Sequence, residues 1–113
     1  MKVVIIGKGE MLANLIEGSL SAGCEVAGVL RYEKTIMPPL LLKLRDFFKT
    51  SYDVTLIKEK KLHEINCKSA NSAKFKNELI KLNADVLLVG TWKEKLKKDI
   101  IDTPVSASVN VHP

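Results

Sequence analysis

Short apolar runs alternate with longer amphipathic segments along the chain, and this alternation is the feature that most restricts the fold. The runs KVVIIG and DVLLVG are continuous and rich in β-branched residues, as is typical of strands buried on both faces. Each strand is joined to the next amphipathic segment by a short loop, and a helix between successive strands favours a parallel sheet. The pattern predicts a doubly wound, Rossmann-like α/β domain with a five-stranded parallel sheet and helices on both faces. The expected strands are residues 2–7, 25–30, 53–57, 85–90 and 106–111.

The segments between the strands carry apolar residues every three or four positions, which predicts amphipathic helices. We expect Asn71 or Ser72 to cap the third helix, and Thr91 with Glu94 to form a capping box for the fourth. The lysine-rich stretch after residue 57 is expected to be a loop. The apolar stripes of the four helices are Leu12, Leu15, Ile16 and Leu20; Leu40, Leu41, Leu44, Phe47 and Phe48; Phe75, Leu79 and Leu82; and Trp92, Leu96 and Ile100.

The length and composition fit one globular domain. The chain has 113 residues, of which 46% are hydrophobic and 27% charged, so we expect a single domain over residues 1–113. A doubly wound sheet buries the inward side chains of its strands. The side chains expected to be almost fully buried are Val4, Ile6, Val29, Leu87, Val89 and Val109.

The charges and cysteines exclude several classes of function. The net charge of +5 is concentrated in lysine runs without interleaved aromatic residues, which favours a solvated surface over nucleic-acid binding. Cys24 and Cys67 are far apart and lack the spacing of metal ligands, so no metal site is expected. No apolar run is long enough to cross a bilayer. Without a secretory signal at the start, the expected location is the reducing cytoplasm.

The turn GKGEML after the first strand partly matches a dinucleotide-binding fingerprint. Leu12 stands where the third glycine belongs, and Glu10 near the helix N-terminus would repel a phosphate. Arg31 ends the second strand, where an NAD site carries an acidic residue, although an arginine suits a 2′-phosphate. A nucleotide-binding Rossmann module therefore stays open as an alternative.

The end of the chain, SASVNVHP, places polar residues on one face of the last expected strand. Asn110 and His112 are two positions apart and therefore share that face, at the carboxyl end where parallel sheets bind ligands. Histidine transfers protons near neutral pH, and an asparagine amide donates to an oxyanion. The pair suits acyl or formyl transfer. The pattern also allows both side chains simply to complete hydrogen bonds at the strand end.

Several stretches resemble the folate-dependent formyltransferases. The ending VNVHP, after this order of strands and helices, is similar to the Asn-x-His-Pro element of that family. Residues 1–30 resemble the first strand, helix and second strand of methionyl-tRNA and sugar-amine formyltransferases. Residues 83–113 follow the family pattern without gaps, and residues 31–82 match it least.

The resemblance implies an enzyme that transfers a formyl group from 10-formyltetrahydrofolate to a primary amine. Asn110 and His112 match the catalytic pair of the family, in which the asparagine stabilises the oxyanion and the histidine manages the proton. Lys93 and Lys97 replace a glycine and a proline that the family commonly carries near the pterin. The residues implied to bind the cofactor are Gly90, Thr91, Trp92 and Leu96.

The resemblance also suggests the amine acceptor. Methionyl-tRNA is favoured slightly over an amino-sugar nucleotide. The family pattern continues after the proline with a Ser-Leu-Leu-Pro stretch and a catalytic aspartate. We therefore expect residues 1–113 to be the N-terminal portion of a longer formyltransferase domain, inactive by itself.

Overall fold

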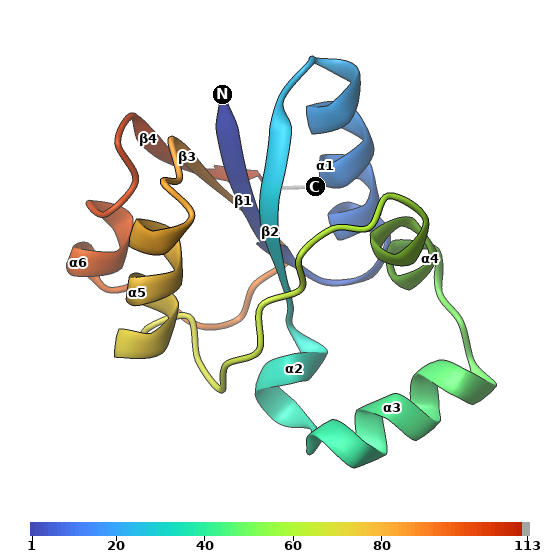
Figure 1. Cartoon of the computed structure of the whole chain (residues 1–113). Coiled ribbons are helices and arrows are strands. Elements are labelled where there is room, and N and C mark those ends of the chain that lie inside the picture. The colour runs from blue at the N-terminus through green and yellow to red at the C-terminus, as the bar shows by residue number, and fades with distance from the viewer. Residues whose placement is uncertain (112–113) are drawn as a thin grey trace.

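Four parallel strands form the sheet in the computed structural model, which describes residues 1–111. Their order is β2-β1-β3-β4, so the central strands are the two continuous β-branched runs (Figure 1). The strands are β1 (Lys2–Gly7), β2 (Glu25–Arg31), β3 (Val86–Gly90) and β4 (Ala107–Val111). The predicted doubly wound α/β fold is confirmed, with four strands in place of five.

Helices cover both faces of the sheet (Figure 1). Side chains alternate along a strand, so Val4 and Ile6 of β1 pack with α5 and α6 on one face. Val3 and Ile5 pack with α1 and α4 on the other. The helices are α1 (Gly9–Ser21), α2 (Glu33–Ile36), α3 (Pro39–Phe48), α4 (Tyr52–Glu59), α5 (Ala73–Lys81) and α6 (Lys98–Ile101). As expected, the Ser72 side chain caps α5 by accepting a hydrogen bond from the Phe75 amide.

The predicted strand at 53–57 is wrong, because these residues form helix α4. Its buried residues include Val54, Leu56 and Ile57, a spacing that lies on one side of a helix. Leu56 and Ile57 pack into the same core as α1. A run of five residues fits a strand or a helix turn equally well, and packing against α1 decides between them.

Residues 63–65 lie beside β2 at the edge of the sheet. The Val29 amide donates to the His63 carbonyl at 2.9 Å, and the Ile65 amide donates to the Val29 carbonyl at 2.8 Å. These two hydrogen bonds make a single parallel bridge, Val29 with Glu64. The loop predicted for the lysine-rich stretch therefore includes one extended segment attached to the sheet.

The expected burial holds for β1, β2 and β3 and fails at the β4 edge. Val4, Ile6, Val29 and Leu87 are completely buried and Val89 is 5% exposed, but Val109 is 42% exposed. Val109 pairs with Leu88, on the face covered by α1. α1 packs against β1, β2 and β3, so its cover stops short of the outermost strand.

Helix α3 forms where the sequence predicts it, but its apolar stripe faces solvent. Leu42 is its one buried residue, whereas Leu40, Phe47 and Phe48 are more than two-thirds exposed. Figure 1 shows α2 and α3 beyond the carboxyl ends of the strands, away from both faces of the sheet. In the described part of the chain, no helix is long and apolar enough to cross a membrane.

Candidate functional site

A hollow of about 260 Å³ lies beside the carboxyl ends of β3 and β4. Asn110 pairs in register with Val89, whose side chain lies in the core under α5 and α6. Residues paired across parallel strands point to the same face, so the Asn110 side chain lies on the α6 side of the sheet. The hollow is lined by Val89, Trp92, Glu94, Lys95, Leu96, Ile101, Ser108, Val109 and Asn110.

The structure brings together three of the predicted site residues, namely Asn110, Trp92 and Leu96. Trp92 is half-buried and its ring meets the ring of Tyr32 edge-on, with the centroids 5.1 Å apart. Leu96 packs against the same core as α5. The hollow therefore combines an amide, an indole and an aliphatic wall, which suits a planar heterocycle with a polar reacting group.

Residues 92–97 are not the helix that the sequence predicts. Thr91 has φ of +56°, and α6 begins only at Lys98, so the predicted capping box is wrong. The Glu94 carboxylate instead accepts hydrogen bonds from the Ala70 amide at 2.9 Å, the Trp92 indole at 3.3 Å and the Ser69 hydroxyl. These contacts tie the segment to the loop before α5.

Asn71 holds the same segment from a second side. Its side-chain nitrogen donates to the Lys95 carbonyl at 2.8 Å, and its side-chain oxygen accepts from the Lys97 amide at 2.7 Å. The Asn71 and Glu94 contacts together fix an irregular backbone that carries Trp92 and Leu96. The sequence gives no local signal for this arrangement, because the partners are more than twenty positions apart.

Gly90 and Thr91, both predicted cofactor residues, are outside the lining of the hollow. Gly90 ends β3 and is tightly enclosed, since an added Cβ would lie 2.6 Å from Met11 Cγ. A Cβ on Gly7 would lie 2.5 Å from the Gly90 carbonyl oxygen, so the ends of β1 and β3 approach closely. Gly90 and Thr91 lead the chain into the Trp92 segment, and their contact with a cofactor stays a prediction.

His112, the second predicted catalytic residue, lies outside the residues that the structure describes, and its role stays a prediction. Ser108, which sequence analysis did not select by itself, also lines the hollow, and its hydroxyl donates to the Ile101 carbonyl at 2.7 Å. The polar stripe of the last strand was the available signal for Ser108. Ser108 and Asn110 of that stripe line the hollow.

Arg31 is committed to ion pairs, which removes the expected basis for a 2′-phosphate site. Its side chain is 3% exposed, and both terminal nitrogens of the guanidinium donate to Asp46, at 3.2 and 2.8 Å. Its Nε donates to Glu64 at 2.5 Å. Burial opposes the charge, but the hydrogen bonds with Asp46 and Glu64 outweigh it and raise the pKa of Arg31.

Within residues 1–111, no three His, Cys, Asp or Glu side chains gather as metal ligands would. The titratable groups in the hollow are Glu94, which accepts the hydrogen bonds described above, and Lys95. Glu94 is occupied by these hydrogen bonds, and the proton-transfer group predicted from the sequence is His112.

Comparison with known proteins matches the fold to formyltransferases. No family model and no curated protein matches the sequence. Among solved structures, phosphoribosylglycinamide formyltransferase from Bacillus halodurans superposes with a TM-score of 0.67 and 17% identity. Glycinamide ribonucleotide transformylase 1 from Symbiobacterium toebii gives 0.66 and 13%, and that from Geobacillus kaustophilus gives 0.66 and 11%.

These superpositions include nearly all of this chain, with coverage of 100%, 100% and 99%, but only 56%, 51% and 57% of the three neighbours. The chain thus spans about half the length of the solved structures it matches. At this level of identity the likeness establishes the fold. The resemblance to formyltransferases seen in the sequence is therefore confirmed for the architecture.

Proposed function

We propose that this chain forms part of an enzyme that transfers a formyl group from 10-formyltetrahydrofolate to a primary amine. The observation that carries the proposal is the hollow in which Asn110 lies with Trp92 and Leu96, in a fold shared with formyltransferases. It lies at the carboxyl ends of parallel strands, where α/β sheets bind ligands.

Each residue has a defined task in this reaction. The amine attacks the formyl carbon, and the carbonyl oxygen gains negative charge that the Asn110 amide stabilises by donating a hydrogen bond. Trp92 and Leu96 provide the apolar wall for the pterin of the donor. His112 takes the proton that the attacking amine loses and passes it to the folate nitrogen, and the bond between that nitrogen and the formyl carbon then breaks to release tetrahydrofolate. The Glu94 and Asn71 contacts hold the wall in place before the donor binds.

The acceptor has three candidates. The matched structures are glycinamide ribonucleotide enzymes by name, which makes glycinamide ribonucleotide the first acceptor to test. Methionyl-tRNA, favoured by the sequence, and an amino-sugar nucleotide follow. The exposed Glu10 in the first turn of α1 disfavours a phosphate at that helix N-terminus, which argues against binding the phosphate of glycinamide ribonucleotide there.

A binding experiment tests the donor site. Trp92 is the only tryptophan and lines the hollow, so its fluorescence reports on this site. We expect a folate to change this emission with saturation, and NADPH to produce no saturable change. Leu96→Ala should weaken folate binding about tenfold through the lost apolar contact, whereas Leu44→Ala, on the exposed face of α3, should leave it unchanged. Saturable NADPH binding with no folate response would favour the nucleotide-binding alternative.

Activity tests the catalytic assignment. In a formyl-transferring protein that contains this chain, Asn110→Asp should lower kcat by more than about 10²-fold, since a donor becomes a negative charge facing the oxyanion. The KM for the formyl donor should change little. His112→Asn should lower kcat by about 10²–10⁴-fold. Residues 1–113 alone should not formylate any of the three acceptors. If both variants keep full turnover and melt at a sharply lower temperature, the pair is structural.

A further inference from the structure

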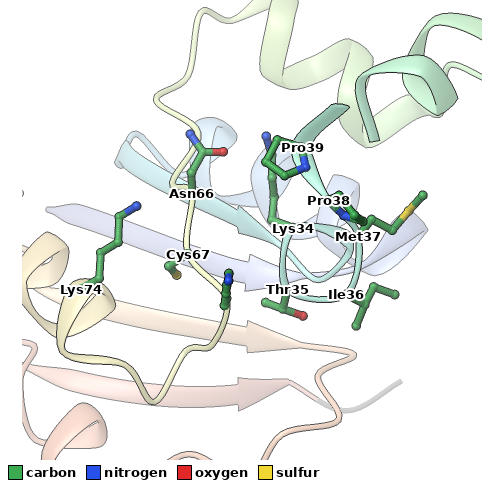
Figure 2. Close-up of a pocket in the computed structure, with 10 residues that line it drawn as sticks. Lys34, Thr35, Ile36, Met37, Pro38, Pro39, Asn66, Cys67 and Lys74 are labelled. Atoms are coloured by element: carbon green, nitrogen blue, oxygen red, sulfur yellow. The ribbon is translucent and has the colours of Figure 1, made fainter. Parts of the chain in front are cut away.

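A second and larger pocket lies between the α2–α3 junction and the start of α5. Its volume is about 500 Å³, within the range of small-molecule sites. It shares no lining residue with the hollow around Asn110. The lining comprises Lys34, Thr35, Ile36, Met37, Pro38, Pro39, Asn66, Cys67, Lys68 and Lys74 (Figure 2).

The polar part of this lining is cationic. Three lysines contribute to it, and no aspartate or glutamate does. In Figure 2, Lys34 and Lys74 flank Asn66 and Cys67 from opposite sides. Lys34 Nζ is 3.8 Å from Glu64, whereas Lys68 and Lys74 have no ion pair within 4.0 Å among residues 1–111.

Two nearby carboxylates are already engaged. Glu64 receives the Nε hydrogen bond of Arg31, and Glu94 accepts from Ser69, Ala70 and Trp92. The charges of Lys68 and Lys74 are therefore available to a ligand. Lysine ammonium groups act as point charges, which attract a phosphate or a carboxylate group alike.

The remaining wall is apolar. Ile36, Met37, Pro38 and Pro39 form one side, and Cys67 is buried on the other. Burial raises the pKa of the Cys67 thiol, so this side chain is neutral and behaves as a small apolar group. An ion alone would leave this wall in contact with water.

We propose that this pocket binds a small organic oxyanion, in which a phosphate or carboxylate group contacts Lys68 and Lys74 and an apolar body lies against Ile36, Met37 and the prolines. The assignment is independent of the function of the Asn110 hollow. It predicts that affinity needs both parts of the ligand.

Titration of the chain with simple probes tests both parts, with backbone NMR shifts locating the site. Phenyl phosphate and benzoate should each shift the amides of Thr35, Cys67 and Lys68 and saturate, and the tighter of the two identifies the anion that the pocket prefers. Inorganic phosphate should bind at least about fivefold more weakly than phenyl phosphate, given the apolar area lost. Benzyl alcohol should not saturate. Equal binding of benzyl alcohol, or shifts elsewhere, would overturn the proposal.

Paired variants separate a site from general positive charge. The double variant Lys68→Gln/Lys74→Gln should weaken phenyl phosphate binding about tenfold or more. The control Lys58→Gln/Lys81→Gln removes the same charge from exposed positions outside the pocket and should change affinity less than about twofold. Equal losses in the two double variants would show that the anion follows net charge alone.

Discussion

Helices α1 and α3 have similar apolar spacing in the sequence, and the fold uses the two stripes in opposite ways. In α1, Leu12 and Ile16 are fully buried against the sheet. In α3, Leu44 and Phe48 are 51% and 81% exposed, and Leu42 alone is buried. Periodicity identifies a stripe on a helix, whereas the surroundings decide which way the stripe faces.

The difference has a physical origin in how each helix is attached. α1 crosses between the paired strands β1 and β2, so it must lie on the sheet and bury its apolar side. An ion pair holds α3 in place, because Asp46 on its inner side binds the buried Arg31. The residue before Asp46, Arg45, is 3.7 Å from Glu33 of α2. Because the charged side of α3 faces inward, its apolar stripe faces solvent.

The largest effect on stability is expected from the buried stripe of α1. Ile16→Ala should lower the free energy of unfolding by about 2–5 kcal/mol, because it leaves a cavity between α1 and the sheet. Urea denaturation followed by circular dichroism measures this change. A loss below about 1 kcal/mol would mean that α1 packs loosely and that the two helices differ less than the structure indicates.

A smaller effect is expected from the charge that orients α3. Asp46→Asn should cost about 1–3 kcal/mol, since Arg31 loses a charged partner while it keeps Glu64. Hydrogen exchange should accelerate in α3 and remain slow in α1. The matched control is Asp102→Asn, which removes an exposed carboxylate from a surface pair with Lys98 and should leave both exchange patterns unchanged.

The smallest effect belongs to the outer stripe itself. Leu44→Ala and Phe48→Ala should each change the free energy of unfolding by less than about 0.5 kcal/mol, because the side chains are in solvent before and after unfolding. The free energy of unfolding of each variant should be measured in the same denaturation series as Ile16→Ala. A loss of 2 kcal/mol or more at Phe48 would place the stripe against another surface.

Much of the fold follows from local sequence signals. The continuous β-branched runs predict β1 and β3, and Ser72 before Phe75 predicts the start of α5. The run at 53–57 was assigned wrongly, since its helical form depends on contact with α1, far away in the sequence. The outward orientation of α3 was hidden for the same reason, because the pair of Arg31 with Asp46 forms only after folding.

The candidate site was predictable in part. The carboxyl-end position and the family resemblance led to Asn110, Trp92 and Leu96, which the structure places around one hollow. The role of Glu94 was missed because Thr-x-x-Glu is also the signature of a helix cap. Its actual partners, Ser69 and Ala70, lie in another loop.

The single bridge between Val29 and Glu64 bears on how the sheet avoids aggregation. A strand edge with free amides and carbonyls recruits strands from other molecules, and proteins often guard such edges with lysine. The segment beside β2 is short, and exposed lysines precede and follow it at positions 58, 60, 61 and 68. Another strand that approached this edge would have to desolvate several of these like charges, which disfavours its pairing there.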